Sequence, residues 1–234
     1  MKYFSIIIPM YNEEKNVLPL LDDIEQAINK EIYQIEVIII DDGSSDKTSN
    51  VLKENLKRYS YFISLINHKK NLGQSRSIYS GIKASQYNTI VTIDGDCQNN
   101  PSDIPKLVDI YFSNDECDLV AGIRTKRNDN IIKILSSKLA NTIRKKILKD
   151  DCDDTGCSLK VLNKEKFKLI PYFNGIHRFI PALYKGLNCK IIFESVGHRK
   201  RNFGKSKYGI YNRLFKGIND LIKVYMIIKN MQKK

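Results

Sequence analysis

The sequence predicts an α/β fold with a mostly parallel central sheet, of the Rossmann-like type that binds nucleotides. Three observations support this class. Short apolar runs alternate with segments whose apolar residues recur at helical spacing, which is typical of strands separated by helices. The runs are mostly apolar and do not alternate strictly with polar residues, as expected of strands covered on both faces. Two of them end in acidic clusters, and ligands of such sheets bind beyond the carboxyl ends of the strands.

The first half of the chain supplies most of the expected elements. We expect strands at 4–9, 37–40, 63–66, 90–93 and 118–122. The helices between them are expected at 14–29, after a cap at Ser45 or Asp46, after the Asn71–Gly73 turn, and from Asn100 and Pro101 onward. The second half is less regular, with expected helices at 130–149 and 177–185, strands at 158–162 and 190–196, and a basic loop at 198–208.

Composition indicates a globular chain. Of its 234 residues, 42% are hydrophobic and 28% are charged, which suits one domain over 1–209 followed by a tail at 210–234. The apolar run after Met1 stops at Pro9, so we expect no signal peptide, and no run approaches the length of a membrane span. The five cysteines form no CxxC pair, which favours a reducing cytosol over a disulfide framework.

The charge balance indicates an anionic partner. Lys and Arg number 39 against 26 Asp and Glu, which gives a formal charge of +13. Nucleic acid, an anionic membrane surface and phosphorylated small molecules all fit this charge. A nucleic-acid-binding protein is a weaker alternative, because no reader motif is present and the aromatic residues do not interleave with a basic stripe.

The stretch from Tyr211 to Ile228 places apolar residues at helical spacing, with basic residues among the polar positions. Such an amphipathic helix suits a membrane interface with anionic lipids. The alternative is that its apolar face packs on the domain or on a partner subunit.

Asp94-Gly95-Asp96 is the sharpest local motif. Two carboxylates one residue apart at a strand end suit a hard divalent cation that keeps positions open for phosphate oxygens, and Gln98 can add an oxygen. The alternative is a solvated acidic turn that caps the next helix. The second cluster, Asp41-Asp42, has the same two interpretations, a nucleotide contact by Asp42 or a turn and cap.

Pro9 and Tyr11 open the loop after the first strand. Tyr11 is suited to stacking on a base and Glu13 to hydrogen bonding with it, while Asn12 is alternatively a helix cap. The basic loop, with Arg199, Lys200, Arg201, Lys205 and Lys207 around Gly204, suits two phosphates, or alternatively forms a solvated surface.

Four motifs in order resemble those of family 2 glycosyltransferases with the GT-A fold. They are residues 7–14 (Ile-Ile-Pro-Met-Tyr-Asn-Glu-Glu), 41–46, 71–73 and 94–98. Residues 154–157 and 199–209 extend the resemblance toward the dolichol-phosphate mannosyltransferase-like branch, which loads a sugar onto a polyprenyl phosphate. The resemblance covers the chain from Ser5 to about Tyr225.

The resemblance implies a role for each matching residue. The nucleotide would be held by Pro9, Tyr11, Glu13, Ile40 and Asp42. The donor diphosphate and its Mg²⁺ or Mn²⁺ would meet Asp94, Gly95 and Asp96, with Asp96 and Gln98 as the direct metal ligands. Phosphate of the donor, the acceptor or both would be bound by Arg124, Arg201 and Lys207, which with Asp96 are the candidate catalytic residues.

The expected activity is metal-dependent, inverting transfer of a hexosyl group from a GDP- or UDP-linked sugar to a dolichyl- or undecaprenyl-type phosphate, on the cytoplasmic side at the membrane surface. A phosphate acceptor is already anionic near neutral pH, so the site needs cations rather than a base. The nearest alternative is a hydroxyl acceptor on a cell-surface glycan, which needs a general base, with Asp153 or Asp154 as first candidates. His177 and His198 are expected to be structural.

Overall fold

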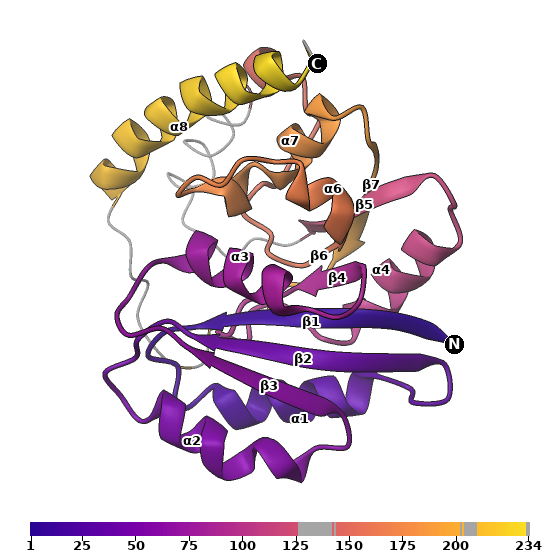
Figure 1. Ribbon diagram of the computed structural model, residues 1–234, viewed down its shortest axis with the longest axis vertical. Helices are drawn as coiled ribbons and strands as arrows, with labels where there is room; N and C mark the ends of the chain where they lie inside the picture. The colour runs from indigo at the N-terminus through magenta and orange to yellow at the C-terminus, as the bar shows by residue number, and fades with distance from the viewer. Residues whose placement is uncertain (126–141, 143, 202, 204–209, 233–234) are drawn as a thin grey trace.

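The computed structural model describes residues 1–125, 142, 144–201, 203 and 210–232 (Figure 1). Seven strands form one sheet in the order β3-β2-β1-β4-β6-β5-β7. The strands are β1 (Lys2–Met10), β2 (Tyr33–Asp41), β3 (Phe62–Asn67), β4 (Thr89–Thr92), β5 (Cys117–Arg124), β6 (Lys160–Asn163) and β7 (Lys190–Val196). The α/β class and the mostly parallel sheet predicted from the sequence are confirmed.

Helices cover both faces of this sheet. They are α1 (Val17–Ala27), α2 (Thr48–Asn55), α3 (Gln74–Ala84), α4 (Asp103–Phe112), α6 (Lys164–Lys168), α7 (Ile180–Gly186) and α8 (Ile210–Met231), with short 3-10 turns at Leu56–Arg58 and Ile176–Arg178. In Figure 1, α1 and α2 lie on one side of the strands, and α3, α7 and α8 lie on the other.

The two faces carry separate hydrophobic clusters, and β1 contributes to both. Phe4, Ile6 and Ile8 pack with α1, α2 and α4. Ile7 packs with α3, α7 and α8. Because successive side chains of a strand point to opposite faces, this double burial explains why the run from Phe4 to Pro9 is apolar without alternation.

The strand β6 differs from the expected parallel arrangement. It pairs antiparallel with both β4 and β5 and so separates these two parallel strands. The apolar run predicted at 158–162 is a strand over Lys160–Asn163. An apolar run specifies burial on both faces but not the direction of its neighbours, so the sequence pattern carried no information on this reversal.

Two helix starts also differ from the expected positions. The helix predicted at 14–29 begins at Val17, because Asn12 adopts a positive φ of 53° and its side chain accepts a hydrogen bond from Ser45 N rather than capping a helix. The helix expected from Asn100 and Pro101 begins at Asp103, after a turn in which the Asn100 and Pro101 carbonyls accept hydrogen bonds.

Other predicted helices are confirmed in part. The segment 177–185 divides into the 3-10 turn and α7, with the break at Phe179. Residues 144–148 are helical, but most of the helix expected at 130–149 lies outside the described residues. The helix predicted at 211–228 is confirmed as α8, and its Ile228 packs against Gly186 of α7. A domain boundary at 209 stays a prediction.

In the described part of the chain, none of the helices combines the length and the apolar character that crossing a bilayer requires.

Candidate active site

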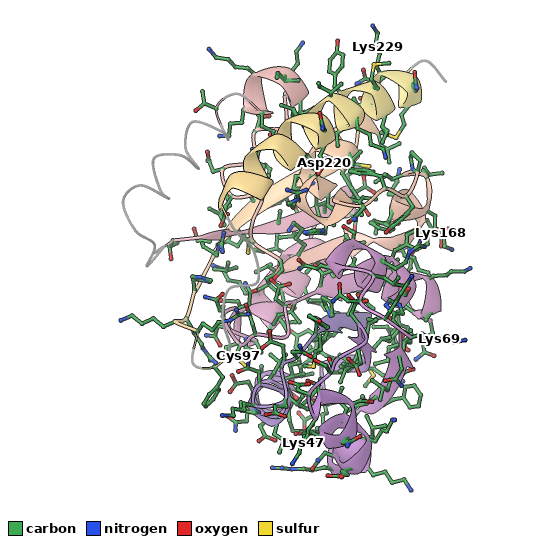
Figure 2. All side chains as sticks on the ribbon, turned by 90° about the vertical axis from the view of Figure 1, so that its left-hand side faces the viewer. Lys47, Lys69, Cys97, Lys168, Asp220 and Lys229 are labelled. Carbon is green, nitrogen blue, oxygen red and sulfur yellow. The ribbon has the colours of Figure 1, made fainter. Side chains whose placement is uncertain are left out.

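The loops that carry the predicted motifs meet at one edge of the sheet. The strands β1, β2 and β4 are parallel, so the segments after Met10, Asp41 and Thr92 share their carboxyl edge. The antiparallel β6 begins at this edge, which brings residues 154–159 there as well. Figure 2 views the molecule from this edge and labels Cys97, the residue after Asp96.

Asp94 is half-buried behind this edge and held by two contacts. Its Oδ1 accepts a hydrogen bond of 2.5 Å from Nε2 of Gln74, and its backbone N donates to Oγ of Ser158. Burial raises the pKa of Asp94 to about 7, and the negative charge of Asp96 adds to the rise. The two carboxylates of the motif therefore repel each other at close range.

Asp96 is paired across the edge with the basic segment that follows β7. Its Oδ2 accepts a hydrogen bond of 2.9 Å from Nη2 of Arg201, and its Oδ1 accepts one of 3.2 Å from the backbone N of Gln98. The side-chain nitrogen of Gln98 lies 3.5 Å from Nε2 of His198. The expectation that Gln98 ligates a metal stays a prediction.

A divalent cation fits the chemistry of this donor set. Two mutually repelling carboxylates are stabilised by a nearby cation, and oxygen is the ligand type that Mg²⁺ and Mn²⁺ prefer. Among the described residues, His, Cys, Asp and Glu form no group of three or more that could hold a metal. A cation held by Asp94 and Asp96 would therefore take its remaining ligands from uncharged oxygens such as that of Gln98, from substrate phosphate and from water.

Gly95 allows the motif to lie directly against β1. A Cβ atom at this position would come within 2.7 Å of Cγ of Met10 and 2.9 Å of the Pro9 carbonyl oxygen. Pro9 is itself the register partner of Ile40 on β2. The three predicted site residues are thus brought together, Pro9 and Ile40 on neighbouring strands and Gly95 in the turn after β4, while Tyr11 is half-buried in the loop after β1.

Asp42 organises the segment that leads into α3. Its Oδ1 accepts from Leu72 N at 3.0 Å and lies 2.7 Å from Nδ1 of His68, and its Oδ2 accepts from Gly73 N at 2.8 Å. These contacts support the turn-forming interpretation of Asp42. Its predicted contact with a nucleotide stays a prediction. The cap expected at Ser45 or Asp46 is not formed, because Lys47 is the N-cap residue of α2 and makes no side-chain capping bond, while Oδ1 of Asp46 accepts from Thr48 N in the turn before the helix.

Glu13 lies between the loop after β1 and the basic segment. Its Oε2 accepts from Nδ2 of Asn16 at 2.6 Å, and its Oε1 accepts from Nη2 of Arg201 at 3.3 Å. The same guanidinium nitrogen thus contacts Glu13 and Asp96. The structure brings together three of the predicted site residues, from segments that are far apart in the sequence.

Arg124 is engaged in a bidentate ion pair with Asp154. Its Nε lies 2.6 Å from Oδ2 and its Nη2 lies 2.8 Å from Oδ1 of that carboxylate. The phosphate contact predicted for Arg124 stays a prediction. Asp153 and Asp154 are the candidate general bases if the acceptor is a hydroxyl group. Asp154 is buried against the Arg124 guanidinium, and Asp153 is exposed and pairs with Lys145.

The rest of the basic loop is described only in part. Arg199 pairs with Asp23 and donates to Oδ1 of Asn100 at 2.6 Å. Lys205, Lys207 and Gly204 lie outside the described residues, so the role expected for Lys207 stays a prediction.

Sequence reasoning missed Gln74 and Ser158, which contact Asp94. Both side chains are uncharged, and the motifs that predict the site consist mainly of charged residues. The available signal for Gln74 was its position directly after the Asn71–Gly73 turn, which follows β3 at the same edge. His177 is half-buried with its Nδ1 2.7 Å from Oγ of Ser75, and burial lowers its pKa to about 3. The structural role expected of it stays a prediction.

The family follows from comparison with known proteins. The model described as Glycosyl transferase family 2 matches residues 5–170, more than half of the chain, and the chain therefore belongs to this family of glycosyltransferase enzymes. The chain is therefore an enzyme of this family, which favours the glycosyltransferase interpretation over the nucleic-acid-binding alternative based on its charge.

Two curated relatives illustrate the similarity. The chain is 33% identical over 228 residues to a dodecaprenyl-phosphate galacturonate synthase of Rhizobium johnstonii, covering 96% of this chain and 67% of that protein. It is 30% identical over 209 residues to an undecaprenyl-phosphate 4-deoxy-4-formamido-L-arabinose transferase of Edwardsiella ictaluri, covering 89% and 64%. The chain thus spans roughly two thirds of the length of these relatives.

A solved structure shows the same fold. The glucosyl-3-phosphoglycerate synthase of Mycobacterium tuberculosis, in complex with Mn²⁺, uridine-diphosphate-glucose and phosphoglyceric acid, superposes with a TM-score of 0.73 at 17% identity, covering 97% of this chain and 80% of that one. The GT-A type of fold expected from the sequence is confirmed.

Proposed function

We propose that this enzyme transfers a glycosyl group from a nucleoside-diphosphate sugar to a polyprenyl phosphate, with inversion at the anomeric carbon and with Mg²⁺ or Mn²⁺. The observation that carries the proposal is the contact of Arg201 with Asp96 and Glu13. In this contact a cation of the basic segment lies directly beside Asp96, one of the two carboxylates suited to the donor's metal ion. A site of this kind suits a reaction between two phosphate-bearing substrates.

On the donor side, Asp94 and Asp96 would hold the cation, with Gln98 as a further ligand. A bound divalent cation would neutralise the negative charge that develops on the departing diphosphate. The base and ribose would lie over Pro9, Tyr11, Ile40 and Asp42. Glu13 would orient Arg201 toward the phosphates.

On the acceptor side, the proposal needs positive charge and no general base. An oxygen of the acceptor phosphate forms the new bond to the anomeric carbon, and the bond from that carbon to the diphosphate breaks. A phosphate monoester is already largely ionised at neutral pH, so no proton has to be removed. Arg201, Lys207 and Arg124 are our candidates for binding its charge.

The arrangement of Asp153 and Asp154 favours this acceptor over a hydroxyl group. A general base must reach the proton that it removes. Asp154 has both carboxylate oxygens engaged by Arg124, and Asp153 is exposed beside Lys145. In this arrangement both candidate carboxylates form ion pairs with basic side chains, which disfavours either of them as the general base.

The relatives support the acceptor class and widen the donor class. Both are named for transfer to a polyprenyl phosphate, one with galacturonate and the other with an arabinose derivative. The expectation of a hexosyl donor is therefore too narrow, and we propose a hexose, uronate or aminopentose type of sugar linked to UDP or GDP. A lipid acceptor also implies work at a membrane surface on its cytoplasmic side.

The test is transfer of labelled sugar from a panel of UDP- and GDP-linked donors to polyprenyl phosphate, counted in the organic phase with Mn²⁺ or with EDTA. We expect label with at least one donor, only with metal, and a loss of about 100-fold or more in Asp96→Asn.

The matched control is Asp115→Asn, which removes an exposed carboxylate in the turn before β5. It should transfer at the wild-type rate. Full activity of Asp96→Asn would remove this residue from the metal site. Metal-dependent donor hydrolysis without organic-phase label would move the acceptor to a hydroxyl-bearing glycan.

A further inference from the structure

We propose that Arg201 serves as an internal counter-ion of the donor site, which the metal–nucleotide complex must displace from Asp96 before Arg201 can bind phosphate. The inference rests on the proposed function and adds a competition between the enzyme's own cation and the metal ion. It concerns the side chain of Arg201 and the two carboxylates that it contacts.

The contact places one guanidinium nitrogen on two carboxylates. Nη2 of Arg201 lies 2.9 Å from Oδ2 of Asp96 and 3.3 Å from Oε1 of Glu13. The side chains of Glu13 and Asp96 are only 7% and 15% exposed. Ionised groups this far from water need a nearby positive charge, and Arg201 supplies it to both.

Asp96 is also an expected metal ligand, and Oδ2 is the oxygen that its contact with the backbone N of Gln98 leaves for the metal, because that contact engages Oδ1. A guanidinium hydrogen-bonded to Oδ2 and a divalent cation bound to that oxygen repel each other at close range. Metal binding at Asp96 therefore requires Arg201 to leave. The diphosphate that accompanies the metal brings negative charge to the same place, so the displaced guanidinium acquires a new partner.

The backbone just before Arg201 is anchored beside the site. Gly197 N donates to Oδ2 of Asp103 at 2.8 Å, and Arg199 N donates to the Gln98 carbonyl at 2.8 Å. His198 also forms a bridge with Asn99. The segment after β7 is thereby tied to the loop that carries Asp96, and Arg201 stays within reach of the site in both arrangements.

The two roles of Arg201 predict opposite effects of one substitution. In Arg201→Gln the competitor is lost, so the affinity for Mn²⁺ alone should rise by about fivefold or more. With saturating UDP or GDP the phosphate contact is lost, so the affinity for Mn²⁺ should fall by about tenfold or more. If Arg201 only stabilised the fold, or only bound phosphate, its replacement would not raise the affinity for Mn²⁺ alone while lowering the affinity with nucleotide.

The experiment is Mn²⁺ titration of the full chain, followed by electron paramagnetic resonance of free Mn²⁺, without nucleotide and with UDP or GDP. The control Arg58→Gln removes the same charge from an exposed arginine paired with Asp22, and both its affinities should stay within about twofold of wild type. Arg201→Lys keeps the charge, should remain close to wild type without nucleotide, and serves if Arg201→Gln does not fold.

An affinity for Mn²⁺ alone that is unchanged or lower in folded Arg201→Gln would overturn the competition. An increase in Arg201→Lys as large as that in Arg201→Gln would also overturn it. If wild type transfers sugar and binds Mn²⁺ with nucleotide, such results leave the proposed function standing. If wild type neither transfers sugar nor binds Mn²⁺ with either nucleotide, the proposed function fails and the competition with it.

Discussion

At the scale of single residues, Asp94 is held in place by an uncharged neighbour. Nε2 of Gln74 donates to its carboxylate at 2.5 Å, from the first turn of α3. Groups that hydrogen-bond a metal-binding carboxylate fix its orientation and its charge. We therefore assign Gln74 as a positioning residue of the proposed metal site, acting through Asp94.

Replacing Gln74 with Met keeps the length of the side chain and removes the donor. We expect Gln74→Met to weaken binding of Mn²⁺ with UDP by about tenfold or more, measured by calorimetric titration, with an unchanged melting temperature. Gln26→Met, on the exposed face of α1, is the matched control. Equal affinities in the two variants would show that Gln74 does not orient Asp94.

His177 makes the stability of the fold depend on pH. Burial lowers its pKa to about 3, whereas an unfolded chain has a histidine pKa near ~6.5. Between these values the unfolded state binds one more proton, so stability is full above about pH 6.5 and falls as the pH drops. From pH 7 to pH 5 we expect the wild type to lose about 2 kcal/mol through this group.

His177→Asn removes the titrating ring, and its amide can face Oγ of Ser75. Urea unfolding at pH 5, 6 and 7 should give a flatter pH dependence in the variant than in the wild type. Parallel curves would mean that His177 is protonated in the folded chain or that other groups determine its acid stability.

The sequence predicted the acidic residues of the site better than their partners. Asp94 and Asp96 follow a buried strand, so their place at the carboxyl edge follows from strand direction alone. The contact between Asp96 and Arg201 joins residues 105 positions apart. A contact of this kind depends on the path of β7 and the loop after it, which no local pattern specifies.

At the scale of elements, α3 is pressed against the sheet at Gly81. A Cβ atom here would lie 2.5 Å from Cγ2 of Ile7 and 2.8 Å from Cδ1 of Ile40. Since Ile40 is a proposed nucleotide contact, the packing of α3 against it also affects the position of a residue of the proposed nucleotide site. Two effects of substitution oppose each other, because alanine favours a helix and crowds the core.

We expect crowding to prevail in Gly81→Ala. Overpacking costs about 1–3 kcal/mol, against a gain in helix propensity of about 1 kcal/mol. Thermal and urea unfolding should therefore show a net loss of stability. Gly217→Ala in α8 is the matched control, since a Cβ there meets nothing within 4 Å and should stabilise the helix. A stabilised Gly81→Ala would contradict the close packing of α3.

At the scale of the whole molecule, α8 has apolar residues on two sides. Val224 and Ile228 are buried on the domain, whereas Ile222 and Met226 are 59% and 52% exposed. Asp220 is neutralised by Arg178 at 2.5 Å. The packing interpretation of this helix is confirmed for one face, while the membrane interpretation of the exposed face stays a prediction. Figure 2 shows Asp220 and Lys229 on α8, at the opposite end of the molecule from Lys47.

The charge of +13 and the exposed face of α8 predict binding to anionic membranes. We expect co-sedimentation with phosphatidylglycerol vesicles that weakens as salt rises, and a loss of about tenfold in affinity in the double variant Ile222→Ser with Met226→Ser. Phe62→Ser, which removes an exposed aromatic residue from β3, should bind as wild type does. Equal loss in both would indicate nonspecific adsorption.

The reversed strand β6 also affects how the chain is made. The neighbours of β5 in the sheet are β6 and β7, and both are synthesised after it. Leu119 and Val120, fully buried in the finished protein, therefore leave the ribosome with no strand to pair with. At usual rates of translation this lasts about 2–8 s, until Asn163 has been added. Asp118 and Arg124 are the charged residues of β5, and they oppose its aggregation until β6 has been synthesised.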